Sequence, residues 1–558
     1  MNRCYAAFGL LMICLAGCSS PGVHRTMPTD PSTGLIIAAG HVITGDLRGT
    51  LRDQAIVVRN GRIAAITSIE EARRTAPELT VLDARGLTVL PGLTDAHAHI
   101  ESLGKALETV SLVNTSSYEE VIARIKKRAA ETPKGEWIIG RGWDQNDWPE
   151  KVFPDAKSLD RSVPDHPVWV ERIDGHAGLA NSAAMRIARI TASSEDPSGG
   201  KILRLDDGSP AGVFVDAATD LIDRAVPTPT RAVRKRRIQQ ATRTIAGYGI
   251  TSVHDAGVDQ TAIELFQELA DEGALPIRVY LMLSDNAKLL QEWFARGPLV
   301  DYKGLVTVRS VKLYADGALG SRGAALLEPY DDEPANSGLL LTSAEHIRDV
   351  SHRARAAGFQ VNTHAIGDRA VRMVLDAYEK AGVVPADRFR IEHLQVIAPD
   401  DLPRLGSMGI IASMQPTHAT SDMPWAGSRL GPTRVRRAYA WRQVLASGGR
   451  LALGSDFPVE EVNPWLGIHA AVTRQDGNGQ PEAGWYPEER LTLDEAIRGF
   501  SADAAYAAFQ ERDAGTIEPG RRADFTLIAN DLDQQTKSLR QVVTRFTITG
   551  GRVVFKTE

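Results

Sequence analysis

Runs of apolar residues alternate with polar segments of helical length along the middle of the chain. The runs are short, rich in β-branched residues and bounded by Gly, Pro or Asp, which favours strands with helices between them. This alternation is typical of a parallel α/β architecture. Eight runs carry the pattern: 88–99, 249–257, 277–283, 308–317, 359–368, 389–395, 409–416 and 450–458.

Eight strands are the number that a (β/α)8 TIM-like barrel needs, and such barrels carry their active sites at the C-terminal ends of the strands. Seven of the eight runs have a polar or ionisable residue near that end, and 277–283 is the exception. We therefore predict an α/β fold with a barrel over 91–512, and a functional site where its strands end.

Short β-branched runs return at both ends of the chain, over 34–90 and 513–558. Asn60 and Gly61 lie between two of the N-terminal runs, and Asn-Gly between apolar runs is a strong hairpin signal. Two small β regions need partners to bury their apolar faces. We expect them to form one small β-sandwich domain built from both chain ends.

The stretch between the first two barrel runs, about 100–248, is far too long for a simple connection. It contains short strand-like runs followed by Gly, Asp, His or Trp, and we interpret it as an insertion after strand 1. Trp143 and His176 are candidates to reach a substrate from this insertion. The alternative is that they belong to its own core.

The first residues are not expected to be part of the fold. A short positive start and an apolar stretch predict a signal peptide over 1–17. The run that ends it, LAGC, resembles the lipobox of bacterial lipoproteins, which implies lipidation of Cys18. Residues 18–33 have the composition of a flexible tether. We expect an exported protein, lipid-anchored to a bacterial membrane and specifically to the outer membrane facing the periplasm; a plain secretory signal is the alternative.

Composition and charge narrow the partners. Hydrophobic content of 43% and charged content of 24% are ordinary for a globular enzyme. A formal net charge of -6 is too small to steer a polyanion, and the short basic run 231–237 is explained by one solvated helix face. We expect no nucleic-acid partner, and a homo-oligomer stays open.

His97 and His99 end the first barrel run and share one side of a strand, because residues two apart face the same way. Imidazole is the commonest metal-binding side chain. All three cysteines lie within the first 18 residues, so nitrogen and oxygen must supply any metal site. Further candidate ligands end other runs, and each of them alone has an ordinary explanation, such as a hydrogen-bonded histidine or a helix cap. Together with His97 and His99 they make six candidate ligands in strand order, which predicts a metal centre. The other candidates, each ending a further run, are Lys312, His364, His393 and Asp456.

The order His-x-His, Lys, His, His, Asp resembles the amidohydrolase superfamily, and the flanking strings resemble its YtcJ-like branch, amidohydrolase family 3. The strings include GLTDAHAH, VKLYADGALGSRGAAL, NTHAIGDRAV, RIEHLQVI and GSDFPVE. The resemblance implies a metal-dependent hydrolase barrel and a divalent metal, zinc by preference, as one or two ions. It implies the following ligands: His97, His99 and Asp456 for a first ion, His364 and His393 for a second, and a carboxylated Lys312 as the bridge.

The expected reaction is hydrolysis of a non-peptide, amide-type C–N bond in a small molecule. A Zn²⁺-type ion lowers the pKa of bound water to about 7. Asp456 is then the catalytic general acid and base, which passes a proton from the attacking hydroxide to the leaving nitrogen. For the charged residues beyond the strand ends, ion-pair scaffolding of the loops is the alternative to substrate contact. The candidates for substrate contact or ligand support are His254, Asp316, Arg322, Asp368 and His418.

Three other functions are weighed against this one. Deaminases of the superfamily typically have His-x-x-Glu at the fifth strand and lack the lysine, whereas this chain has His364-Ala-Ile-Gly367 and Lys312. Ester or lactone hydrolysis would use the same site. A non-catalytic lipoprotein that binds metal or ligand has no physical need for Asp456 together with Lys312.

Overall fold

The computed structural model describes residues 34–46, 48–172, 175, 177–197, 200–529, 532 and 536–557. The predicted signal peptide, the tether and Cys18 lie outside the described residues. Two compact units are present: one holds Glu101–Arg237, and the other holds the described residues up to Ile100 and from Ile238 onward. Within the described ranges, no helix combines the length and the apolarity needed to cross a membrane.

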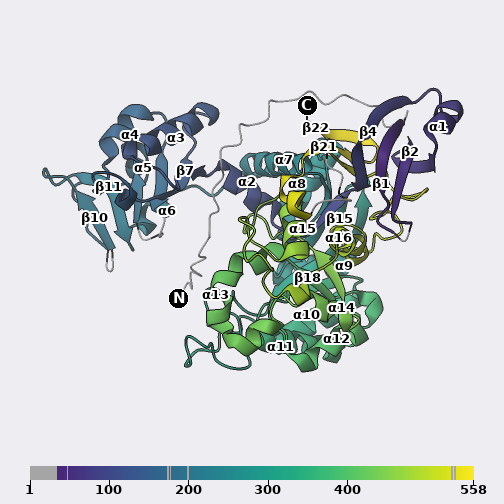
Figure 1. Cartoon of the computed structure of the whole chain (residues 1–558). Coiled ribbons are helices and arrows are strands. Elements are labelled where there is room, and N and C mark those ends of the chain that lie inside the picture. The colour runs from purple at the N-terminus through teal and green to yellow at the C-terminus, as the bar shows by residue number, and fades with distance from the viewer. Residues whose placement is uncertain are drawn as a thin grey trace. The chain divides into compact units, whose positions relative to one another are not determined.

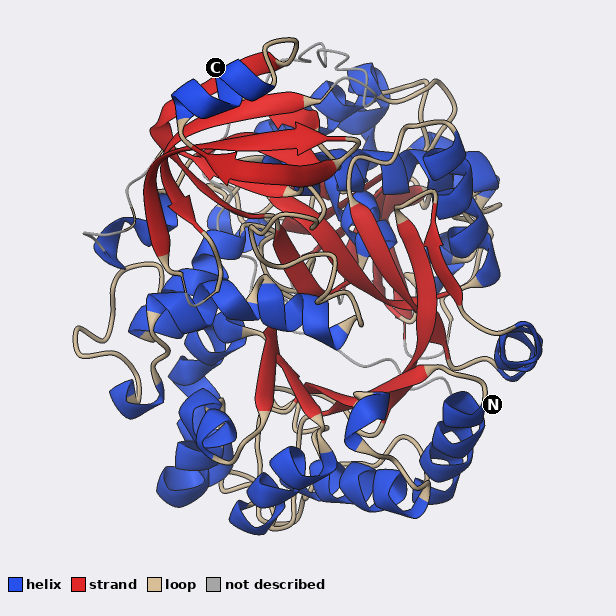
Figure 2. Cartoon of the chain, turned by 90° about the vertical axis from the view of Figure 1, so that its right-hand side faces the viewer, coloured by secondary structure: helices blue, strands red, loops and turns tan. Residues whose placement is uncertain are grey.

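The larger unit is built around eight parallel strands whose spatial order follows their order in the chain. Each overlaps one of the eight predicted runs, which confirms the TIM-like barrel; Figure 2 shows these strands in red among blue helices. A ninth strand, β14 (Leu299–Tyr302), pairs antiparallel with one of them. The barrel strands are β5 (Leu93–Ala98), β12 (Ile250–Val258), β13 (Arg278–Ser284), β15 (Val306–Tyr314), β16 (Gln360–Ala365), β17 (Arg390–His393), β18 (Ile411–Met414) and β19 (Arg450–Leu453).

Hydrogen bonds around Asp95 close the barrel between β5 and β19. The Asp95 carboxylate accepts from the hydroxyl of Ser455 at 2.6 Å and from its backbone N–H at 3.1 Å. One residue further on, the backbone N–H of Asp456 donates to the carbonyl of His97 at 2.8 Å. These bonds bring two predicted ligands from opposite ends of the barrel sequence to adjacent positions.

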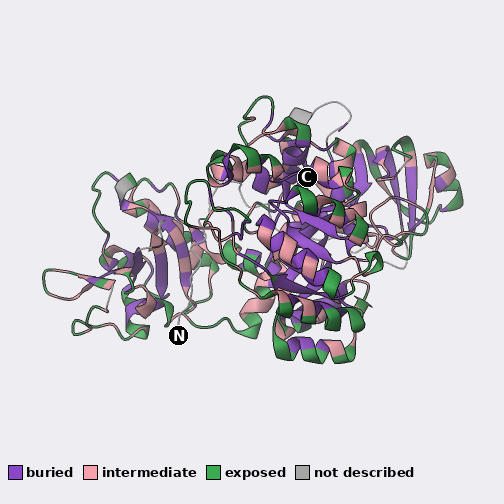
Figure 3. Cartoon of the chain, turned by 90° about the horizontal axis from the view of Figure 1, so that it is seen from below, coloured by how far each residue is buried: buried purple, intermediate pink, exposed green. Residues whose placement is uncertain are grey.

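Helices cover the outside of the barrel. Figure 3 shows the buried strands (purple) and the exposed outer faces of the helices (green). In α11, apolar residues recur every three or four positions and are buried, as expected for a helix with one face on a sheet. The helices after the strands are α8 (Gln260–Asp271), α9 (Ala287–Arg296), α10 (Ala344–Ala356), α11 (Asp368–Lys380), α12 (Leu402–Met408), α13 (Pro416–Arg434), α14 (Trp441–Ala446), α15 (Pro464–Thr473), α16 (Leu493–Gly499) and α17 (Ala502–Ala507).

Both chain ends contribute to one seven-stranded sheet with the order β22-β21-β20-β4-β1-β2-β3. The predicted hairpin is confirmed: Arg59 pairs with Arg62, and Asn60 and Gly61 between them have φ values of +50° and +71°. A sandwich of two facing sheets stays a prediction. The elements are β1 (Leu35–Ile43), β2 (Thr50–Arg59), β3 (Arg62–Thr67), α1 (Ile69–Thr75), β4 (Thr80–Pro91), β20 (Phe525–Ile528), β21 (Thr544–Thr549) and β22 (Arg552–Lys556).

The predicted single strand over 88–99 is wrong in one respect, because two sheets share it. Its first part ends β4 of the terminal sheet at Pro91, and β5 of the barrel begins at Leu93. Gly92 lies at the junction, where a Cβ atom would stand 2.2 Å from the hydroxyl oxygen of Thr251. Only glycine permits this approach, which lets the chain leave one sheet and enter the other.

The smaller unit, Glu101–Arg237, has its own six-stranded sheet with the order β10-β11-β9-β8-β7-β6 (Figure 1). Its buried core is separate and contains Trp143, Trp148 and Leu179. It therefore folds around its own apolar residues. Its strands and helices are β6 (Val110–Ser111), α3 (Tyr118–Glu131), β7 (Ile138–Trp143), α4 (Ala156–Ser162), β8 (Val168–Arg172), β9 (Ala177–Ala180), α5 (Ser182–Ile187), β10 (Gly200–Arg204), β11 (Pro210–Asp216) and α6 (Asp220–Asp223). Two helices join the units along the chain, α2 (Ile100–Glu108) and α7 (Arg231–Gly247).

Candidate active site

The predicted ligands meet at the C-terminal edge of the barrel strands. The ring centroids of His97 and His393 are 4.8 Å apart, and those of His364 and His393 are 4.6 Å apart. The ring of His99 lies 5.6 Å from that of His97. Nζ of Lys312 lies 3.1 Å from Nε2 of His97. Residues from four strands thus form one cluster.

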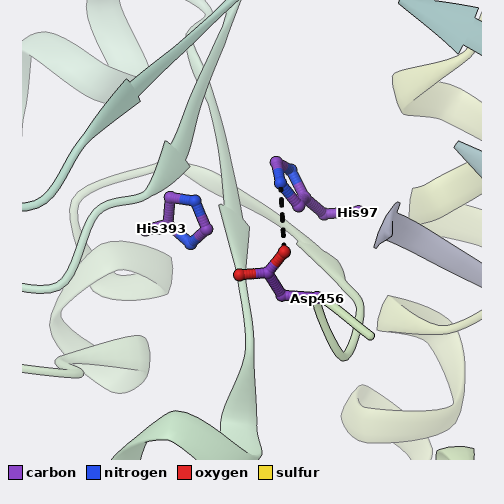
Figure 4. A group of neighbouring side chains, drawn as sticks. All are labelled: His97, His393 and Asp456. Carbon is purple, nitrogen blue, oxygen red and sulfur yellow. Dashed lines mark ion pairs between the residues drawn. The ribbon is translucent and has the colours of Figure 1, made fainter. Parts of the chain in front are cut away.

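Asp456 joins this cluster from the end of β19. Its Oδ1 lies 3.2 Å from Nε2 of His99 and 3.6 Å from Nε2 of His97. Figure 4 shows the carboxylate facing His97 and His393. One donor atom from each of these three residues lies within 4.8 Å of the others. In this triad, His97 and Asp456 are expected at the first ion and His393 at the second.

Hydrogen bonds at Nδ1 orient three of the imidazoles and leave Nε2 as the nitrogen that would bind a cation. In each, Nδ1 faces an oxygen that accepts a hydrogen bond. In the neutral ring, Nδ1 then carries the hydrogen and Nε2 the lone pair. Burial lowers the pKa of His99, but its bond to Oδ1 of Asp456, 3.2 Å from Nε2, outweighs burial and raises that pKa. The pairs are His97 with the Glu392 carboxylate, His99 with the carbonyl of Ala256 at 3.0 Å, and His393 with Oε1 of Gln415 at 2.8 Å.

His364 gives independent support for a bound ion. Its Nε2 is buried and has no hydrogen-bond partner among the described residues. A buried polar atom without a partner is costly, so an occupant of the site is expected to satisfy it. Imidazole nitrogens and a carboxylate, without thiolates, suit zinc and other divalent transition metals. The residues present therefore fit a divalent metal ion.

Burial sets the protonation of these groups. Burial, with a contribution from the charge of Lys312, lowers the pKa of His97 to about 4 and that of His364 to about 3. Both rings are therefore neutral at pH 7. Burial also lowers the pKa of Lys312 to about 8. Burial raises the pKa of Asp456, but its bond to His99 and the nearby histidines outweigh this and hold the pKa below its usual value.

The backbone is strained at two of the predicted ligands. His393 has a φ of +74° and Asp456 a φ of +62°. Left-handed backbone at residues other than glycine costs about 1–3 kcal/mol and persists only where the surrounding structure enforces it. Such strain is concentrated at functional sites, and here it turns both side chains at the point where a strand ends.

Glu392 is a functional residue that the sequence analysis missed. It is fully buried, bonds to Nδ1 of His97, and forms an ion pair with Nε of Arg390 at 2.7 Å. Arg390 also donates to the hydroxyl of Ser413 at 2.7 Å. Two opposite charges, two positions apart in the strand-like run 389–395, are the sequence signal for this pair.

Three of the candidates for supporting contacts lie beside the cluster. Oδ1 of Asp316 lies 3.6 Å from Nε2 of His364. Nδ1 of His254 lies 3.0 Å from Nη1 of Arg390, so this ring belongs to the buried network below His97. His418 stacks on His393, with centroids 6.0 Å apart, and its Nε2 lies 3.9 Å from Oδ2 of Asp456.

Three acidic or basic candidates have structural partners in the loops, which favours the scaffolding alternative. Asp316 accepts from three backbone N–H groups, at 2.8–2.9 Å, and so holds the loop after β15 to the loop after β16. Asp368 accepts from the backbone N–H of Leu327 at 2.8 Å. Arg322 forms an ion pair with Asp332 at 2.9 Å.

The candidates in the insertion have different outcomes. Trp143 is fully buried, and its indole N–H donates to the carbonyl of Val170 at 2.9 Å. The expected substrate contact is therefore corrected to a role in the insertion's core, because the ring has no exposed surface and its N–H is already bonded within the same unit. His176 lies outside the described residues.

The parallel barrel and the nitrogen and oxygen donors at its C-terminal edge define a metal-dependent hydrolase of the TIM-barrel class. Comparison with known families agrees with this class. The chain belongs to the amidohydrolase family, whose profile matches residues 80–555. It is therefore a hydrolase that acts on carbon–nitrogen bonds other than peptide bonds.

Relatives match over almost the whole chain. Protein LONG AFTER FAR-RED 3 of Arabidopsis thaliana is 33% identical and covers 95% of this chain and 93% of its own. The amidohydrolase YtcJ of Bacillus subtilis (strain 168) is 32% identical over 90% of this chain and 96% of its own. A solved structure of an uncharacterized metal-dependent hydrolase from Pyrococcus furiosus has a TM-score of 0.74 at 29% identity, covering 89% of this chain and 99% of that chain.

Proposed function

We propose that this protein hydrolyses an amide-type C–N bond in a small molecule, with Asp456 as general acid and base. The observation that carries the proposal is the arrangement of His97, His99 and His393, whose Nδ1 atoms are bonded to oxygen acceptors, around the Asp456 carboxylate. A relative named N-substituted formamide deformylase, from Arthrobacter pascens, is 29% identical over 91% of this chain and 96% of its own. It supports N-formyl amines as first substrates to test.

The chemistry divides between a bound ion and the chain. One or two divalent ions, zinc in our proposal, would lower the pKa of a water molecule to about 7 and polarise a substrate carbonyl. Asp456 accepts a proton as water adds to the carbonyl carbon and returns it to the leaving nitrogen. Its lowered pKa keeps it ionised and ready to accept.

Lys312 is proposed to act as a carbamate that bridges two ions. Its Nζ is buried beside Nε2 of His97, where an ammonium group and divalent cations would repel each other. The lowered pKa of Lys312 increases the fraction of neutral amine, which is the form that reacts with carbon dioxide. Conversion to a carbamate replaces a cation with an anion that can bind metal.

A substrate screen with metal-loaded protein tests the proposal. The panel contains N-formyl amines, N-acyl amino acids and cyclic imides, with esters, lactones and aminated heterocycles as the competing classes. We expect release of amine from a member of the first group, loss of activity with a chelator, and recovery with added zinc. Turnover confined to esters or to ring deamination, or metal-free protein with no turnover, would overturn the proposal.

We also propose that the protein is exported and anchored to the outer membrane, facing the periplasm, through a lipid on Cys18. The support is the order of the first residues: a positive start, an apolar stretch and then LAGC. Expression with labelled palmitate tests it. The wild-type chain is expected to carry label and sediment with membranes, whereas Cys18→Ser should lose both; label on neither protein would refute the anchor.

A further inference from the structure

His418 borders the proposed catalytic carboxylate without being one of the six predicted ligands. It lies in the first turn of α13, directly after β18, and is only 7% exposed. Its ring stacks on that of His393 at an interplanar angle of 22°. Its Nε2 lies 3.9 Å from Oδ2 of Asp456. The hydrogen bond at the other ring nitrogen, Nδ1, therefore decides whether Nε2 of His418 carries a hydrogen or a lone pair.

Nδ1 of His418 accepts a hydrogen bond, whereas Nδ1 of the predicted ligands His97, His99 and His393 donates one. Nδ1 lies 3.2 Å from Nε2 of Gln395. An amide nitrogen can only donate, so Nδ1 accepts, and the neutral ring carries its hydrogen on Nε2. Gln395 is 5% exposed, and its backbone carbonyl accepts from the N–H of Tyr439 at 2.7 Å. The backbone from which this side chain extends is thus held by a hydrogen bond.

The Nε2–H of His418 is buried beside the site and has no hydrogen-bond partner within the described part of the chain. A buried donor without an acceptor is costly, and a substrate oxygen would supply the acceptor. Nε2 of His97 and His393 offers a lone pair, whereas His418 offers a hydrogen. The cluster therefore contains both ligands for a cation and a donor for an oxygen atom.

We infer that His418 is a catalytic hydrogen-bond donor, which binds the oxygen of the scissile carbonyl group through Nε2–H, and that Gln395 is the positioning residue for it. The inference rests on the proposed amide hydrolysis. As water adds to the carbonyl carbon, negative charge develops on that oxygen and the hydrogen bond strengthens. His418 neither gains nor loses a proton, because Asp456 carries the proton from water to the leaving nitrogen.

Nitrogen NMR of the intact, metal-loaded protein with ¹⁵N-labelled histidine tests the tautomer without any substrate. The difference spectrum against His418→Phe identifies the His418 signals. We expect a one-bond N–H coupling at Nε2 and none at Nδ1. In Gln395→Met, which is of similar shape but has no donor, a signal from hydrogen on Nδ1 should appear. A wild-type ring protonated at Nδ1 alone would overturn the inference, whether or not the protein hydrolyses amides.

Kinetics with N-butylformamide, or the panel compound that the wild type turns over fastest, test the role. His418→Phe keeps an aromatic ring beside His393 and removes the donor. We expect kcat to fall about 10²–10³-fold, the range for loss of one oxyanion donor, with KM changed much less and metal content unchanged. His469→Phe, at a buried histidine of α15, is the matched control and should keep its kcat.

The results separate the two proposals. If the wild type hydrolyses no amide, the proposed function fails, while the NMR spectrum still decides the tautomer. If His418→Phe loses metal in proportion to activity, His418 is a ligand and the inference is wrong. A kcat for His418→Phe within about threefold of the wild type likewise overturns the donor role, because a transition-state donor is worth far more than that.

Discussion

Replacing Glu392 with glutamine should weaken metal binding, although it changes none of the six predicted metal ligands. The carboxylate is fully buried between Nδ1 of His97 and the guanidinium of Arg390. Burial raises the pKa of Glu392, but the charge of Arg390 and the bond to His97 outweigh it, so the group is ionised. The glutamine has nearly the same shape and no charge, and it can turn an N–H group toward His97.

Two effects of this change have different magnitudes. Removing one partner of a buried ion pair costs about 3–5 kcal/mol of folding free energy, because Arg390 stays buried without its counter-charge. Loss of the acceptor behind a metal-binding histidine typically costs 10–100-fold in metal affinity, or about 1.4–2.7 kcal/mol. Arg390 keeps its bonds to Ser413 and to the carbonyl of Ala96, so the fold should be weakened but retained.

Competition with a chelator, followed by measurement of protein-bound metal, gives the change in affinity, and thermal unfolding of the metal-free protein gives the change in stability. Glu489→Gln is the matched control. Glu489 is also buried, but it bonds to Gln443 and to the backbone of Arg442. The Glu489→Gln variant should have a lower free energy of unfolding than the wild type but a metal affinity within about twofold of it. Equal metal affinity in Glu392→Gln and the wild type would refute the reasoning.

Three further variants test the site and its support. Asp456→Asn should keep at least part of its metal and lose about 10²–10⁴-fold in kcat; a near-wild-type kcat on the best panel substrate would remove its assigned role. Lys312→Ala should lose bound metal and activity, and bicarbonate or short carboxylic acids should restore part of both; full metal content and activity without additives would exclude the bridge. Asp524→Asn breaks a buried pair with Arg278, whose Nε lies 2.7 Å away, and should lower the free energy of unfolding by about 3–5 kcal/mol at pH 7. Burial raises the pKa of Asp524, but Arg278 lowers it further, so the net shift is downward. The stabilisation is then present above the unfolded pKa of about 4 and lost as pH falls through the lowered value. Denaturant unfolding at pH 7 and pH 3 should therefore show a smaller difference between the variant and the wild type at the lower pH; an equal difference would contradict this assignment.

The barrel strands were predictable because each is a local apolar run that stands out from its polar neighbours, as at 359–368 and 450–458. The division of 88–99 was not, because the break at Gly92 depends on the side chain of Thr251 more than 150 residues away. The loop contacts of Asp316, Arg322 and Asp368 could not be predicted either, since a charged residue beyond a strand end looks the same whether it binds a substrate or holds a loop.

The sequence by itself determined the class of the protein and the types of its metal-binding groups, because strand periodicity and the order of histidines, lysine and aspartate are properties of short segments. Only the tertiary structure decided what each group can do. Glu392 lies 295 positions from the histidine that it orients, and Gln395 lies 23 positions from His418. An imidazole binds a cation or donates a hydrogen according to the atom opposite its other nitrogen. That atom comes from β17 or from a residue just beyond the end of β17 or β18, so the folded barrel assigns the roles of His97, His393 and His418.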